Sequence, residues 1–314
     1  MSVATPARPV AKPAIALNAA VAERLREYVE LSRPRIALMV LITVAMGYLL
    51  GQRSGWELAG LVHAAIGILL VAAGSSAVNQ WIERDTDALM HRTQNRALPA
   101  GRLLPWEVLC LGLMCAVTGS VYLALNVNLL TAGLTALTFV LYAGVYTPLK
   151  RWTSLCTAIG AIPGAMPPVL GWTASGQPLD LTAFALFGLL FFWQFPHFLA
   201  IAWLHREDYH AAGLRMLPGG RPMPGVTGLM ALGYALGLIP VSLVPAWLGV
   251  AGNLYVVAAV ALGLLYVASA AAFAYSETRT SARRVLWVSL AYLPLVLGWL
   301  AADHARLLFG PGLS

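Results

Sequence analysis

The chain has 314 residues, of which 59% are hydrophobic and only 11% are charged, and its mean hydropathy is +0.74. Ordinary soluble domains carry about 25% charged residues, so this composition excludes a water-soluble globular protein and predicts one that crosses the membrane several times. The net charge of +7 then indicates orientation in the bilayer more than binding to nucleic acid, which usually requires a basic domain outside the membrane.

Apolar windows between polar breaks predict nine membrane-spanning helices. Each window is close to the ~20 residues that a helix needs to cross a bilayer. The predicted fold class is therefore all-α, a polytopic bundle of about nine transmembrane helices. The windows cover residues 36–51, 58–82, 105–125, 128–147, 153–174, 180–204, 225–247, 251–274 and 285–302.

The chain is expected to form one domain over residues 31–303, with a disordered N-terminal tail at 1–30 and a short C-terminal tail at 304–314. The N-terminal tail is rich in Ala, Pro and Val and has no stable apolar period. It lacks an uninterrupted apolar core before Glu23, so a cleaved signal peptide is not expected. An organelle-targeting peptide remains an alternative.

The distribution of positive charge supports this topology. With a cytoplasmic N-terminus, the nine spans place every lysine and arginine on the cytoplasmic side except Arg53 and Arg306. Cytoplasmic loops of membrane proteins carry such an excess of cations. We therefore expect an integral membrane protein whose N-terminus is cytoplasmic.

Three polar residues interrupt the end of the second span. Asn79, Glu83 and Asp87 are spaced four apart, so on a helix they spread over an arc of only about 80°, with neighbours roughly 6 Å apart. Oxygen ligands at this spacing can share a divalent cation, and acids in a membrane segment are costly enough to indicate function. The alternative is a solvated helix end.

Cations gather on the same predicted membrane face as these acids. Magnesium usually binds through one or two carboxylates together with substrate phosphates, so acids and cations together indicate a pyrophosphate ester whose apolar tail lies between the helices. The alternative is that the cations only determine topology. Tyr146 is a candidate for a phosphate hydrogen bond or for an interfacial anchor. The candidate phosphate-binding cations are Arg92, Arg96, Lys150, Arg151 and Arg206.

Several segments resemble a known family. The segment from Asn79 to Asp87 resembles the first aspartate-rich signature of the UbiA-type intramembrane prenyltransferases, with Glu83 in the middle acidic position. Four further segments resemble the branch of that family that farnesylates heme. They are Met90–Pro99, Tyr146–Arg151, Pro163–Pro168 and Gln194–Phe198.

The resemblance implies a helical bundle around a central cavity that opens to the cytoplasmic side of a bacterial inner membrane. There the enzyme would transfer a farnesyl group from farnesyl diphosphate to a vinyl group of heme B, with hydration, giving heme O and diphosphate. The implied ligands for Mg²⁺ are Asn79, Glu83, Asp87 and Asp208. The second acidic signature departs from the wider family, because Ala212 follows Asp208 where a second acid often stands.

His197 lies among Phe and Pro residues in the sixth predicted span. A lone buried histidine is either a hydrogen-bonded core residue or part of a site, and the resemblance favours contact with heme. Two alternatives for the whole chain remain, a prenyltransferase acting on an aromatic quinone precursor and a membrane transporter. The implied partners are the lipid bilayer and a heme A synthase or a terminal oxidase that takes up heme O.

Overall fold

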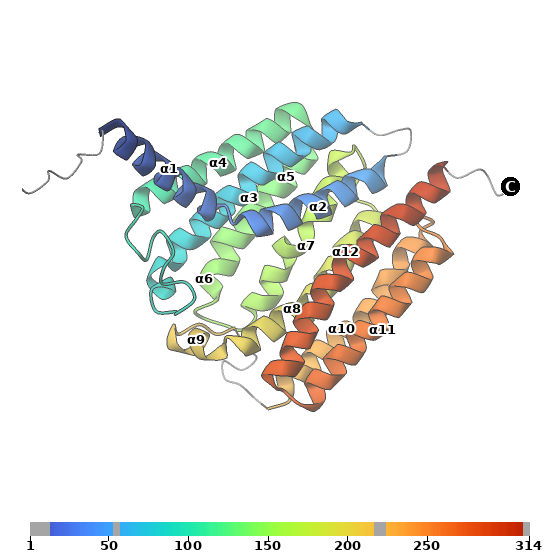
Figure 1. Cartoon of the computed structure of the whole chain (residues 1–314). Helices are drawn as coiled ribbons and strands as arrows, with labels where there is room; N and C mark the ends of the chain where they lie inside the picture. Colours follow the sequence, from blue (N-terminus) through green and yellow to red (C-terminus); the bar gives the residue numbers. More distant parts are fainter. Residues whose placement is uncertain (1–12, 53–56, 217–223, 310–314) are drawn as a thin grey trace, which may run out of the picture.

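The computed structural model describes residues 13–52, 57–216 and 224–309, and the regular structure in these ranges is helical. The predicted all-α bundle is confirmed. In Figure 1, α3, α4 and α5 lie on one side of the bundle and α10, α11 and α12 on the other. The helices are α1 (Pro13–Leu31), α2 (Pro34–Gly51), α3 (Leu58–Asp87), α4 (Pro105–Asn126), α5 (Leu129–Phe139), the π-helix η1 (Val140–Tyr146), α6 (Thr147–Leu149), α7 (Cys156–Ala174), α8 (Leu181–Leu204), α9 (Arg206–Ala211), α10 (Val226–Trp247), α11 (Asn253–Tyr275) and α12 (Arg279–Phe309).

Eight helical stretches among the described residues are long and apolar enough to cross a membrane, and α5, η1 and α6 together form one of them. They match eight of the nine predicted spans. The ninth, residues 153–174, forms α7, which is not among the eight. α7 contains Pro163, Pro167 and Pro168 and is largely buried, packed against α2 and α8. Because it meets protein instead of lipid, it does not need the same hydropathy.

Two helix starts illustrate how local sequence sets these elements. The side chain of Asn128 accepts a hydrogen bond from the Thr131 backbone at 2.8 Å and so caps α5. Asp180 accepts two backbone hydrogen bonds at 3.0 Å at the start of α8. Such caps satisfy amide groups that the helix itself leaves unpaired, which matters most near the bilayer.

Glycines bring α2 and α7 into backbone contact. A Cβ atom at Gly171 would lie 1.9 Å from the carbonyl oxygen of Val44, and one at Gly47 would lie 1.9 Å from that of Pro168. No side chain fits at either position. Close approach at small residues is a common way for membrane helices to associate.

The N-terminal segment differs from the expected disordered tail over residues 1–30. Residues 13–30 belong to helix α1, and residues 1–12 lie outside the described ranges. Glu27 of α1 pairs with Arg102 at 2.5 Å, and Gln80 of α3 donates to the carbonyl of Leu31 at 2.9 Å. These contacts come from residues far away in sequence, which a local pattern does not reveal. At the other end, α12 extends to Phe309, beyond the expected boundary at 303.

Candidate functional site

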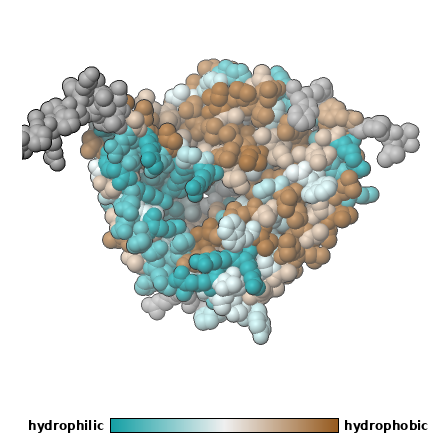
Figure 2. Space-filling view, in the orientation of Figure 1, coloured by the Kyte–Doolittle hydropathy of each residue, from teal (hydrophilic) through white to brown (hydrophobic). Residues whose placement is uncertain are grey.

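The predicted polar face lies at the end of α3 and is buried. Asn79, Glu83 and Asp87 are 0%, 7% and 1% exposed, and α3 continues through all three residues. Figure 2 shows hydrophilic residues gathered on one side of a central hollow, where Figure 1 places the end of α3, α6 and α9. A burial this deep argues against the solvated helix end and for a built site.

Asn79 is held between two segments. Its Oδ1 accepts a hydrogen bond from Nη2 of Arg33 at 3.0 Å, and its Nδ2 donates to Oγ1 of Thr147 at 3.0 Å. Thr147 in turn donates to the carbonyl of Tyr142 in η1, at 2.8 Å. The wide π-helical turn of η1 therefore helps to bring α6 against α3, and π-helical turns occur often at functional sites.

Glu83 forms an ion pair with Lys150, which follows directly on α6. The distance from Nζ of Lys150 to Oε1 of Glu83 is 2.7 Å. The same ammonium group lies 4.3 Å from the centre of the Tyr146 ring, where the ring's negative face attracts a cation. Tyr146 thus contacts the charged group of the site through its ring.

Asp87 pairs with an arginine from the loop that follows α3. Nη1 of Arg96 lies 2.6 Å from Oδ2 of Asp87. The other carboxylate oxygen, Oδ1, is buried and has no hydrogen-bond partner among the described residues. Burial, and then repulsion from Arg33, lower the pKa of Arg96 below its usual value. The Arg96 guanidinium is thus partly desolvated and repelled by a second cation.

Asn79, Glu83 and Asp87 are each paired with one cation, and the three cations come from three different segments. Arg33 comes from the junction of α1 and α2, Arg96 from the loop after α3, and Lys150 from the end of α6. The sequence pattern did not predict Arg33 as a site residue, only as part of the cytoplasmic charge. Its one local signal is its place directly before Pro34 at the start of a span.

Arg33 also has an unusual backbone. Its φ and ψ angles are 50° and 68°, and it is the one described residue other than glycine with a positive φ. This left-handed conformation costs a residue with a Cβ about 1–2 kcal/mol. Such strain persists where the surroundings impose it and is found mostly at functional sites.

The remaining predicted residues lie around this group at various distances. Arg92 donates to the hydroxyl of Tyr209 at 2.8 Å and so joins the loop after α3 to α9. Arg151 donates to the carbonyl of Ile82 at 3.3 Å. Oδ2 of Asp208 on α9 lies 3.7 Å from Nδ1 of His205, the residue directly before that helix. The roles of these residues in binding stay predictions.

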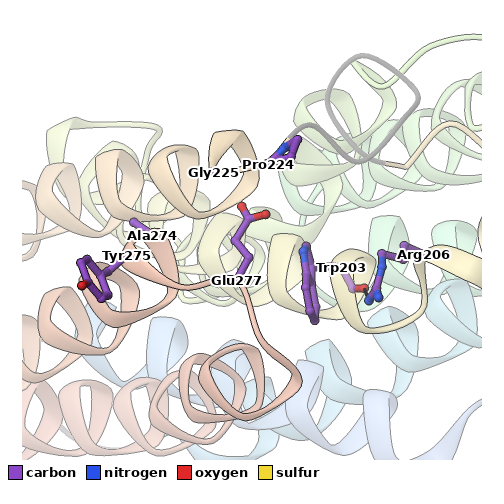
Figure 3. Close-up of a pocket in the computed structure, with 7 residues that line it drawn as sticks. All are labelled: Trp203, Arg206, Pro224, Gly225, Ala274, Tyr275 and Glu277. Carbon is purple, nitrogen blue, oxygen red and sulfur yellow. Dashed lines mark hydrogen bonds between the residues drawn. The ribbon is translucent and has the colours of Figure 1, made fainter.

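Arg206 lines a separate groove of about 430 Å³. Its guanidinium lies 4.2 Å from the centre of the Trp203 ring. Figure 3 shows these two side chains beside each other, with Glu277 and Gly225 across the groove. Glu277 accepts a hydrogen bond from the backbone of Gly228 at 2.7 Å and so caps α10. The structure does not bring Arg206 into contact with the acids of α3.

The donor set at the end of α3 fits magnesium. Its ligand atoms are amide and carboxylate oxygens, which are the ligands that Mg²⁺ prefers, and Oδ1 of Asp87 lacks a partner among the described residues. Across the described ranges, no three His, Cys, Asp or Glu side chains form a group that could hold a metal ion. An ion here would therefore take part of its coordination from the phosphates of a substrate.

Comparison with known proteins decides the family. The sequence pattern of the UbiA prenyltransferase family matches residues 40–296, including the polar end of α3. The chain belongs to the UbiA prenyltransferase family. The resemblance that the motifs predicted is thus confirmed, and the transporter alternative is set aside.

Two relatives show the branch of the UbiA family. A protoheme IX farnesyltransferase of Solibacter usitatus is 45% identical over 292 residues, which cover 90% of this chain and 100% of the relative. A protoheme IX farnesyltransferase of Koribacter versatilis is 42% identical over 305 residues, which cover 94% of this chain and 98% of the relative. Identity at this level over nearly the full length places the chain with this branch.

Solved structures of the UbiA family share the fold. A digeranylgeranylglyceryl phosphate synthase superimposes with a TM-score of 0.75 at 18% identity, covering 90% of this chain and 99% of that chain. A UbiA homolog from Archaeoglobus fulgidus bound to GPP and Mg²⁺ gives a TM-score of 0.60 at 16% identity, covering 89% of this chain and 99% of that chain. At these identities the likeness supports the fold alone.

Proposed function

We infer that this protein transfers a farnesyl group from farnesyl diphosphate to a vinyl group of protoheme IX, with addition of water, giving heme O and diphosphate. The observation that carries this conclusion is the 45% identity over 90% of the chain to a protoheme IX farnesyltransferase. The buried acids and cations at the end of α3 supply a diphosphate site of the required chemistry.

We propose that Asn79, Glu83, Asp87 and Asp208 hold Mg²⁺ and the diphosphate. Bound magnesium neutralises charge that develops on the departing diphosphate. A UbiA homolog from Archaeoglobus fulgidus was solved bound to GPP and Mg²⁺, which supports Mg²⁺ as the metal of the family. Asp208 is the least supported of the four, because no described contact joins it to α3.

The three paired cations are proposed to change partners when substrate binds. Arg33, Lys150 and Arg96 now contact the side-chain oxygens of Asn79, Glu83 and Asp87. A diphosphate carries stronger acceptors, and arginine can bind two of its oxygens at once. Transfer of the cations to the phosphates would leave the α3 oxygens free. The other candidate phosphate contacts are Arg92, Arg151, Arg206 and Tyr146.

The reaction then follows from charge stabilisation. The allylic C–O bond breaks and its electron pair stays on the diphosphate, which the cations stabilise. The π electrons of the heme vinyl group form the new C–C bond to the allylic carbon. The positive carbon left beside the porphyrin takes up water and releases a proton. The apolar surroundings of α7 and α8 keep other water away from the allylic cation.

We also propose the placement of the protein in the cell and its partners. The cations of the site, Arg33, Arg96 and Lys150, all lie in segments whose charge predicts the cytoplasmic face, so farnesyl diphosphate would enter from the cytoplasm of a bacterial cell. The product would pass to a heme A synthase or to a terminal oxidase. The acceptor would be heme B, bound near His197.

The test is product analysis with a matched pair of variants. Purified protein in lipid nanodiscs receives protoheme IX, farnesyl diphosphate and Mg²⁺, and extracted hemes are identified by mass. Asp87→Asn should lower the yield of heme O by at least about 100-fold, because metal-assisted charge stabilisation is worth several kcal/mol. Asp85→Asn is the control, since Asp85 is exposed and lies 3.7 Å from Arg84, outside the buried group.

Three results would contradict the proposal in different ways. Unchanged heme together with prenylation of an aromatic acceptor would keep the family but replace the substrate. Absence of any prenyl transfer by the wild-type protein would refute the activity. Equal yields from the two aspartate variants would refute the assignment of Asp87.

A further inference from the structure

His197 faces the interior between two helices of the bundle. On α8, Trp193 donates to the carbonyl of Ser289 in α12 at 2.8 Å, and Gln194 donates to the carbonyl of Ala161 in α7 at 2.7 Å. At 100° per residue, His197 lies about 40° from Trp193 and about 60° from Gln194. Its side chain therefore points into the sector between α12 and α7.

The opposite side of α8 is occupied by another helix. The ring of Phe195 stacks on that of Tyr234 in α10, with centroids 3.8 Å apart. α2 packs against both α7 and α12, the two helices that flank the sector. His197 is thus directed into the bundle, away from α10.

Ser289 is the hydrogen-bond partner of one ring nitrogen of His197. Oγ of Ser289 donates its only proton to the carbonyl of Leu286 at 2.7 Å, and Ser289 is fully buried. Nδ1 of His197 lies 2.7 Å from the same Oγ. With the Ser289 hydroxyl proton directed to Leu286, Nδ1 is the donor of the His197–Ser289 hydrogen bond, and in that neutral tautomer Nε2 carries a free lone pair.

The other ring nitrogen is open for binding. No hydrogen bond among the described residues reaches Nε2 of His197. This atom is also not one of the fully buried polar atoms that lack a hydrogen-bond partner. The ring stacks on Trp193, with centroids 5.3 Å apart and an interplanar angle of 23°. Ser289 and Trp193 together hold the imidazole in one orientation.

We propose that Nε2 of His197 is an axial ligand of the iron of protoheme IX, and that Ser289 is the positioning residue that fixes its tautomer. This inference rests on the proposed function, since heme is the acceptor there. A metal-bound histidine usually donates its second ring nitrogen to an oxygen acceptor, which orients the ring and raises its basicity. The Nδ1–Ser289 hydrogen bond is of that kind.

The depth of His197 suits a substrate that must meet the diphosphate site. His197 lies seven residues before the end of α8 at Leu204, or about 10 Å along the helix axis. Iron ligation there would place the porphyrin in the sector between α12 and α7, near Trp193 and below the charged face. It would also fix the depth of the ring relative to the diphosphate site.

The other five histidines are less suited to this role. His63 is bonded through Nδ1 to the hydroxyl of Tyr122 at 2.7 Å, near the end of α3 remote from Asp87. His304 contacts the carbonyl of Val250 near the end of α12. The remaining three lie in α9 or beside the spans, at positions 91, 205 and 210. The described chain thus offers one histidine directed into its interior from mid-membrane.

The experiment binds ferric protoheme IX to the purified protein in nanodiscs, without farnesyl diphosphate, and records absorption and electron paramagnetic resonance spectra. The wild type should show a histidine-ligated heme. His197→Ala should lose that signature while its thermal unfolding midpoint stays near that of the wild type, which a misfolded protein would not allow. His63→Ala, a matched control with a similar Nδ1 hydrogen bond, should leave the spectra unchanged. Ser289→Ala should retain ligation but weaken heme affinity by about tenfold.

The outcomes separate this inference from the proposed function. The same preparations are assayed for heme O. If the wild type makes heme O but His197→Ala keeps the wild-type heme spectrum, the assignment of His197 as iron ligand is wrong and the proposed function stands. If the wild type makes no farnesylated heme, the proposed function fails whatever the spectra show. A wild type that binds heme without a histidine signature also overturns the ligation.

Discussion

Arg33 offers the sharpest test of the site, because its side chain and its backbone make separable contributions. The guanidinium donates to buried Asn79 at 3.0 Å, and the backbone is left-handed with φ of 50°. A hydrogen bond that involves a charged group contributes about 1.5–3 kcal/mol. If this contact is transferred to the diphosphate, its loss lowers kcat/KM for farnesyl diphosphate by roughly 10- to 150-fold.

Three substitutions at this position divide the two effects. Arg33→Ala and Arg33→Gly both remove the guanidinium and should lose activity equally. Glycine adopts a positive φ without a Cβ penalty, so the Gly variant should be more stable than the Ala variant by about 1–2 kcal/mol. Arg33→Lys keeps the charge but not the two-pronged geometry, and should lose less activity than either.

The assay measures heme O formation against farnesyl diphosphate concentration in nanodiscs, together with thermal unfolding of each variant. The reasoning is refuted if Arg33→Gly regains wild-type activity, since Arg33 would then serve only the turn between α1 and α2. It is equally refuted if Arg33→Ala retains wild-type kcat/KM.

Four further predictions concern charge, metal, packing and pH. Lys150→Met should destabilise the protein by about 3–5 kcal/mol by leaving Glu83 buried and unpaired; adding Glu83→Gln should recover stability but not heme O formation, and a double variant as unstable as the single one would contradict this. Chelation of divalent cations should abolish heme O formation, and added Mg²⁺ should restore it; activity that persists in excess chelator would contradict a role for the metal in the reaction. Gly171→Ala should cost at least about 1–3 kcal/mol in thermal unfolding, because the new Cβ meets the Val44 carbonyl; Gly298→Ala, with no atom within 4 Å of its Cβ position, is the control. Burial and then Arg92 lower the pKa of His205, so the folded state binds fewer protons and its stability falls as pH drops below about 6.5; His205→Asn should flatten that dependence, and an unchanged pH profile would contradict it.

Hydropathy predicted most of the helices because the bilayer imposes length and composition on each span. It also predicted the face of Asn79, Glu83 and Asp87, since helical periodicity alone aligns residues four apart. The positions of partners such as Arg96 and Lys150 near that face followed from the resemblance and from topology. Their pairing with particular acids did not, because it depends on how loops and helices pack in three dimensions.

The features that local sequence did not predict depend on distant contacts. Helix α1 is held by residues such as Arg102 and Gln80, so its own composition suggested only a tail. The left-handed backbone of Arg33 and the π-helical turn of η1 have no simple sequence signal. The placement of Arg206 in a separate groove depends on how the junction of α8 and α9 lies against the start of α10 and the end of α11, which charge counting cannot resolve.

The composition of α7 has a consequence for how the protein enters the membrane. During synthesis each apolar segment must leave the translocon for lipid, and that transfer is driven by its own hydrophobicity. α7 carries three prolines and is built to be surrounded by other helices, so it gains little from lipid alone. We expect it to wait beside the translocon until α8 emerges and to insert with α8 as a pair. The helix that seals the middle of the finished bundle would then be the one whose insertion depends most on its neighbours.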